Sequence, residues 1–190
     1  MTNTIEEYHN RIIRLKPIIE ENKDLGDRII KGVNAFYCGS DMPADGVLYL
    51  GRGTRSGVLG FEGVYDPVQD KEIRIAVKLN NGIPLPSRTI AQQVGAYERA
   101  FVEDNKPPYF VGILTLPFCG ERIYALVMED ISDGGRLELI EEQDSDFCLV
   151  KLANGDTEKR FIDPNIMEPT DMQNGKKYLE DIARTDIYQT

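Results

Sequence analysis

Residues 49–66, YLGRGTRSGVLGFEGVYD, hold five glycines among apolar side chains. Glycine lets backbone N–H groups approach phosphate oxygens without obstruction from side chains. A Rossmann loop would need a third glycine at position 56 and then a helix, but Ser56 stands there and a strand pattern follows. A Walker-type loop fails as well, because no Gly-Lys-Ser/Thr closes the stretch. The stretch therefore predicts a β-hairpin, and whether it cradles phosphate depends on the residues that follow it.

Helical and alternating patterns divide the chain around this hairpin. Residues 4–33 carry apolar side chains at spacings of three and four, which predicts packing helices kinked or divided at Pro17. A regulatory or partner-binding arm is the alternative for this segment. Thr4 and Glu7 have the spacing of a capping box. Later patterns predict strands at about 47–50, 58–65 and 72–79, a helix opened by Thr89 and Gln92 and ending near Glu103, and strands at FVGILTL and RIYALVMEDI.

The C-terminal third of the chain has a weaker pattern. FCLVKL, the turn ANGD and EKRFID predict a hairpin, because Asn154-Gly155 readily supplies positive φ, and NGKKYLEDIAR predicts a short final helix. We expect a helical segment over 1–46, a sheet domain over 47–132 and a reduced C-terminal portion over 133–190. The predicted class is α+β, with an antiparallel sheet of about five strands, one packed helix and preceding N-terminal helices.

Composition limits the classes of function. A net charge of −10, from 32 acidic and 22 basic residues, argues against binding to nucleic acid or to an anionic membrane. No apolar run approaches the roughly 20 residues that a membrane span needs, and we expect no signal peptide from the polar, acidic pattern MTNTIEEYHN. The scattered Cys38, Cys119 and Cys148 favour free thiols in a reducing, cytoplasmic setting. His9 is the single histidine, which argues against histidine metal sites and Ser-His catalysis.

The strand pattern IRIAVKL places Ala76 and Lys78 on one face, opposite its larger apolar residues. A small apolar residue can lie against a purine ring while the ammonium two residues later reaches phosphate. Glu98, on the following predicted helix, is available as a counter-ion for Lys78.

The order LGRGTRSGV, IAVKL, AYERAF and YALVMEDI resembles the N-terminal lobe of the protein-kinase fold, over residues 48 to about 140. The resemblance implies a phosphate-binding hairpin, an adenine site, a lysine oriented by a glutamate, and a hinge after the fifth strand. On this chain the implied catalytic residues are Lys78 and Glu98. The implied nucleotide-binding residues are Gly51, Gly53, Val58, Ala76, Lys78, Glu129 and Ile131.

The C-terminal part departs from that family. Its catalytic loop, His-Arg-Asp-x-x-x-x-Asn, has no counterpart here, and Asp-Phe-Gly is absent in that form. Asp163 follows a predicted strand in a comparable place, and Asp146 could replace the metal-binding asparagine, so these two are the candidate Mg²⁺ ligands. Glu141 or Glu142 is the candidate base. A solvated acidic loop is the alternative for all of them.

Three functions stay open from the sequence. The first is a compact phosphotransferase that uses ATP and Mg²⁺ and acts on a protein substrate. The second is a pseudokinase-like binding or regulatory module that acts through a protein partner. The third is an unrelated small acidic binding protein whose hairpin only mimics the loop.

Overall fold

The computed structural model describes residues 2–10, 15–39, 47–52, 56–80, 87–132, 137–139, 147–152, 154–162, 168–181 and 185–186. They belong to two compact units, each assembled from separate stretches of the chain. The first, the α4 unit, comprises Met1–Ile12, Ser87–Tyr109 and Asp130–Asp181. The second, the sheet unit, comprises Ile13–Pro86, Phe110–Glu129 and Ile182–Thr190. The units follow spatial contacts rather than the continuous segments 1–46, 47–132 and 133–190.

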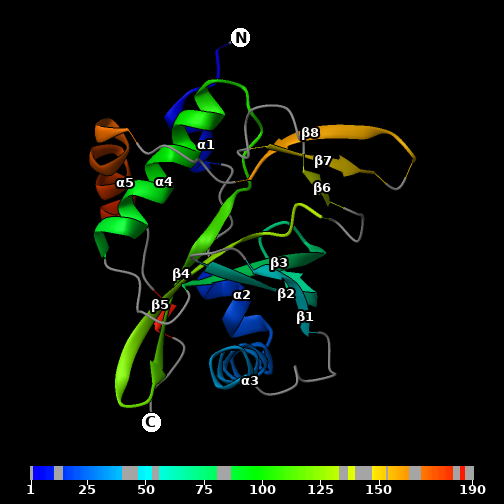
Figure 1. Ribbon diagram of the computed structural model, residues 1–190, viewed down its shortest axis with the longest axis vertical. Coiled ribbons are helices and arrows are strands. Elements are labelled where there is room, and N and C mark those ends of the chain that lie inside the picture. The colour runs from blue at the N-terminus through cyan, green and yellow to red at the C-terminus, as the bar shows by residue number, and fades with distance from the viewer. Residues whose placement is uncertain are drawn as a thin grey trace. The chain divides into compact units, whose positions relative to one another are not determined.

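The sheet unit is built on an antiparallel sheet (Figure 1). Its strands are β1 (Val47–Arg52), β2 (Ser56–Asp66), β3 (Lys71–Asn80), β4 (Phe110–Phe118), β5 (Glu121–Glu129) and the short β9 (Thr185–Asp186). The strand order is β1-β2-β3-β5-β4-β9, with β9 parallel to β4 and the other pairs antiparallel. The α+β class and the antiparallel sheet of five main strands are therefore as predicted.

Two N-terminal helices, α2 (Leu15–Glu21) and α3 (Leu25–Cys38), pack on one face of this sheet (Figure 1). The alternation of β3 directs Ile75, Val77 and Leu79 to that face, where all three are fully buried. The packing role predicted for these helices is thus confirmed. Pro17 lies in the first turn of α2, where its missing N–H costs little. Residues 11–14, before that helix, lie outside the described part of the chain, so the kink or division at Pro17 stays a prediction. Helices α2 and α3 are separated at residues 22–24.

The α4 unit combines helices with a small sheet. Its elements are α1 (Ile5–Asn10), α4 (Ser87–Val102), β6 (Leu137–Leu139), β7 (Phe147–Lys151), β8 (Thr157–Phe161) and α5 (Pro169–Asp181). Strands β6, β7 and β8 form a three-stranded antiparallel sheet. The predicted C-terminal hairpin is confirmed, and Gly155 in its turn has a φ of 91°. The capping box is confirmed too, because Glu7 N–H donates to Thr4 Oγ1 at 3.1 Å and Thr4 N–H to Glu7 Oε2 at 2.9 Å.

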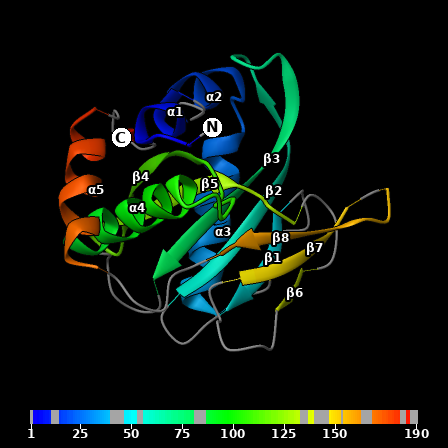
Figure 2. The ribbon, with the colours of Figure 1, turned by 90° about the horizontal axis from the view of Figure 1, so that it is seen from above.

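Helices α4 and α5 lie side by side within this unit (Figure 2). Both begin earlier than the sequence predicted. Helix α4 starts at Ser87 rather than being opened by Thr89, and α5 starts at Pro169 rather than near Asn174. Proline suits the first helical position, since the N–H it lacks has no partner within the helix there. The packing of α4 on the five-stranded sheet stays a prediction, because α4 belongs to the other unit.

Candidate functional site

Strand register brings four of the predicted nucleotide-binding residues together within the sheet unit. Gly51 on β1 pairs with Val58 on β2, and Val58 pairs with Lys78 on β3. Directly opposed residues of an antiparallel pair share a face, and Ala76, two residues from Lys78, shares it as well. We call this side of the sheet the Lys78 face. It is opposite to the face on which α2 and α3 pack.

The surroundings of Lys78 on this face are apolar. Leu126 on β5 is its direct neighbour on the side away from Val58. Lys78 is 6% exposed and Leu126 is fully buried. A lysine is rarely buried to this extent unless its charge is engaged, because removing an ammonium from water is costly. A charge interaction in such a screened position is also stronger than one at the surface.

A glycine and a flexible methionine flank Ala76. Gly60 on β2 and Met128 on β5 are its direct neighbours, and all three are buried. Sequence reasoning missed Gly60, Leu126 and Met128 as members of the Lys78 face. Gly60 could have been found from β2, since it lies two residues from Val58. The two β5 residues could not, because RIYALVMEDI is apolar at nearly every position and shows no alternation.

The predicted hinge residues do not join this group. Glu129, the last residue of β5, pairs with Ile75 and so belongs to the face that α2 and α3 cover. Ile131 lies in the α4 unit, in a turn where the Ser132 N–H donates to Asp130 Oδ1 at 2.9 Å. Met128, rather than Glu129, therefore supplies the β5 side chain beside Ala76.

Glu98 lies on α4 and is fully buried. Since Lys78 and Glu98 belong to different units, their pairing stays a prediction. The remaining predicted residues fall outside the part of the chain that the structure describes: Gly53, Glu141, Glu142, Asp146 and Asp163. Within the described part, histidine, cysteine and acidic side chains form no group of three or more able to hold a metal ion.

Comparisons with protein-family models, with curated proteins and with solved structures find no match to this chain. Among the described residues, no helix combines the length and the apolar character that a membrane span requires.

Proposed function

We propose that this chain binds ATP through the Lys78 face, as a kinase-like nucleotide-binding domain. The observation that carries the proposal is a buried lysine that shares one sheet face with Gly51, Val58 and Ala76. An ammonium screened from water in this way would attract a phosphate group more strongly than one at the surface.

The roles follow from the chemistry of the side chains. Val58 and Ala76 would contact the adenine ring, and Lys78 would bind phosphate, with the backbone of Gly51 and Gly53 nearby. Glu98 would orient the lysine, and the segment from Glu129 to Ile131 would contribute backbone groups to the base. The resemblance to the protein-kinase N-terminal lobe supports this set, because the order of strands and helix along the chain is the expected one.

Isothermal titration calorimetry with ATP, with and without Mg²⁺, tests the binding. Lys78→Ala is expected to weaken ATP affinity about 10- to 100-fold, the range for a lost hydrogen bond to a charged group. Lys71→Ala is the matched control, since it removes the same charge from an exposed position of the same strand. Equal affinity of wild type and Lys78→Ala would contradict the site, and no binding by wild type would favour the unrelated binding protein.

Catalysis is a separate part of the proposal. Phosphoryl transfer depends mostly on positioning and on charge neutralisation by metal, so a missing catalytic loop need not abolish it. Asp163 and Asp146 would hold Mg²⁺, and a protein would accept the phosphate. Transfer of labelled phosphate from ATP by wild type, lost in Asp163→Ala, would support a phosphotransferase. A protein that binds ATP and transfers nothing would be a pseudokinase-like module acting through a partner.

A further inference from the structure

The last turn of α3 lies against the glycine-rich hairpin that β1 and β2 form within the sheet unit. A Cβ added to Gly57 of β2 would lie 2.2, 2.6 and 3.3 Å from the Cε2, Cζ and Cδ2 atoms of the Phe36 ring. Ordinary contact begins at 3.4 Å, so the ring fills the space that a larger residue at position 57 would need. Phe36 is 7% exposed, and Gly57 is buried as well. Packing against α3 therefore explains the glycine at position 57.

Helix α3 follows β2 toward the start of that strand. One turn before Phe36, a Cβ added to Gly32 would lie 3.2 Å from Cδ1 of Leu59. Four helical residues advance about 6 Å, and the two strand residues from Leu59 back to Gly57 span about 7 Å, so helix and strand stay in step. Val33, on the same side of α3, is 2% exposed in the same core. The helix is therefore anchored on the sheet before it reaches Gly57.

The Phe36 ring has little freedom to move. It meets the ring of Tyr37 edge to face, with centroids 5.0 Å apart and an angle of 84° between the planes. A buried ring moves only together with its neighbours, because protein interiors are close-packed. A side chain at Gly57 would therefore have to displace the hairpin, the ring with its neighbours, or both.

Gly57 adjoins two of the predicted nucleotide-binding residues. It directly precedes Val58 in β2, and it pairs with Arg52, which directly follows Gly51 in β1. Successive residues of a strand point to opposite faces, so Gly57 lies on the face that α3 covers and Val58 on the opposite one. The aromatic ring on α3 thus supports the hairpin from the face opposite to the proposed nucleotide site.

We propose that Phe36 is a positioning residue for the nucleotide-binding hairpin, and that α3 controls ATP affinity through it. A backbone N–H binds phosphate well only in a fixed direction, because a hydrogen bond weakens steeply as its angle departs from linear. Support from α3 limits the orientations of the hairpin before ATP binds, which reduces the entropy lost on binding. The inference rests on the proposed function, because Phe36 has this role only if the hairpin binds ATP.

The test exchanges side-chain size between positions 36 and 57. Gly57→Ala places a methyl group where the ring lies, so the hairpin shifts, and we expect ATP affinity to fall about 10-fold in calorimetry. Phe36→Leu removes the tip of the ring and should weaken ATP binding about 3-fold. In the double variant the alanine methyl group enters the space that the ring vacates. We therefore expect ATP affinity to recover to within about 3-fold of wild type.

Gly32→Ala is the matched control. It adds the same methyl group to the same interface one turn earlier, where the nearest atoms are the side-chain ends of Leu59 and Val47. These ends can move by a few tenths of an ångström, so ATP affinity should equal that of wild type. Urea unfolding identifies conditions in which every variant is folded, so that a loss of stability does not enter the affinity. If Gly57→Ala does not fold, Phe36→Leu compared with Gly32→Ala carries the test.

Recovery in the double variant would support the inference, because a general loss of structure is not reversed by a second substitution. Wild-type ATP affinity in Gly57→Ala or in Phe36→Leu would overturn it, as would losses that add in the double variant. These results would leave the proposed function in place. A wild type that binds no ATP, or equal affinity of wild type and Lys78→Ala, would overturn the proposed function and the inference together.

Discussion

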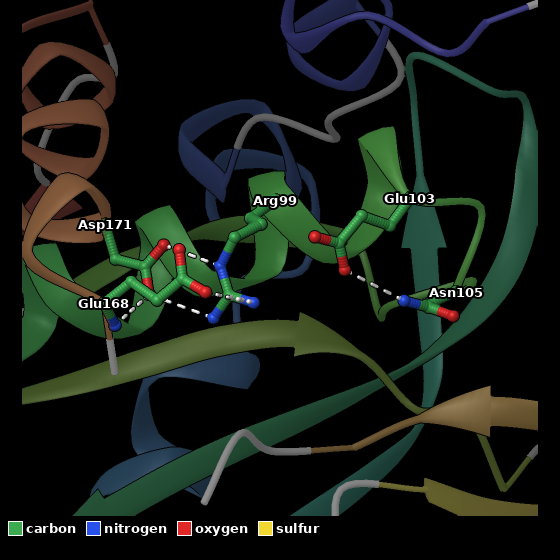
Figure 3. Close-up of polar contacts among 5 residues, drawn as sticks. All are labelled: Arg99, Glu103, Asn105, Glu168 and Asp171. Carbon is green, nitrogen blue, oxygen red and sulfur yellow. Dashed lines mark hydrogen bonds and ion pairs between the residues drawn. The ribbon is translucent and has the colours of Figure 1, made fainter. Parts of the chain in front are cut away.

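Substitution of Gly95 by alanine is the sharpest test of how α4 and α5 pack. The added Cβ would lie 1.7 Å from the Asp171 carbonyl oxygen, whereas ordinary contact begins at 3.4 Å. The helices must therefore separate by about 3.4 − 1.7 = 1.7 Å along that direction. The obstacle is backbone rather than the end of a flexible side chain, so a change of rotamer cannot relieve it. A displacement of this size also breaks the hydrogen bonds between Arg99 and the buried Asp171, which are 3.0 and 3.1 Å long (Figure 3).

The expected cost follows from two opposing terms. Breaking a buried charged pair typically costs about 3–5 kcal/mol. Alanine in place of glycine inside a helix returns about 1 kcal/mol through its higher helix propensity. Gly95→Ala should therefore lower the free energy of unfolding by about 2–4 kcal/mol. Gly175→Ala, with its Cβ 1.7 Å from the Ala91 carbonyl oxygen, should behave in the same way.

Urea unfolding followed by far-ultraviolet circular dichroism measures this difference, with Gly32→Ala as the control. Gly32 is also a buried helical glycine, but its added Cβ would meet the ends of two side chains, Leu59 Cδ1 at 3.2 Å and Val47 Cγ1 at 3.3 Å. Those side chains can move by a few tenths of an ångström, so Gly32→Ala should stay within about 1 kcal/mol of wild type. If Gly95→Ala unfolds at the same urea concentration as Gly32→Ala, the close approach of α4 and α5 is wrong.

Four further predictions concern other parts of the chain. Thr4→Ala removes half of the confirmed capping box and should lower the free energy of unfolding, measured with urea, by about 1 kcal/mol. Equal stability of wild type and variant would show that this cap does not stabilise the fold. Lys78→Met and Glu98→Leu should each destabilise strongly while the double variant loses less than their sum; additive losses would contradict a Lys78–Glu98 pair. Burial raises the pKa of the Cys148 thiol above its usual 9.0, against a smaller opposing effect of Arg160, so the unfolded chain loses this proton first. The contribution of Cys148 to stability should therefore be constant below about pH 8 and be lost as pH rises through the usual and then the raised pKa, and Cys148→Ala should lessen this loss. Thiol labelling at neutral pH should modify the two exposed cysteines quickly and Cys148 slowly, and equal rates would contradict its burial.

Local patterns in the sequence were enough to predict most elements of the sheet unit. The alternation of β3 assigned Ile75 and Lys78 to opposite faces correctly, because large apolar residues occupy only one face of that strand. Register between distant strands was not predictable. The pairing of β3 with β5 depends on residues about 50 positions apart, and β5 has no alternation that would show its two faces. The assignment of Glu129 and Ile131 to a hinge rests on the resemblance, and the sequence does not show that Met128 lies on the Lys78 face.

The contact between α4 and α5 was also beyond the sequence pattern. Helix α5 is polar, and its first turn was missed because Pro169 and Asp171 were not interpreted as helix-start signals. Gly95 and Gly175 each look like helix-weakening residues in isolation. Their role in helix packing depends on a partner helix about 80 residues away in the sequence, which only the fold brings close. The available signal was the four-residue spacing of Ala91 and Gly95 in α4, together with Gly175 in α5.

The buried charged residues Asp66, Asp171 and Lys78 occupy different kinds of position in the fold. The Asp66 carboxylate accepts hydrogen bonds from the Val68 and Gln69 N–H groups of its turn, and Asp171 serves both Arg99 and the start of α5. These acids satisfy the backbone groups that a turn and a helix end expose, so the fold itself accounts for them. Lys78 lies in mid-strand between Val58 and Leu126, where neither a turn nor a helix end requires a charge. In the proposed function the Lys78 ammonium binds phosphate, and the ATP affinity of Lys78→Ala tests that role.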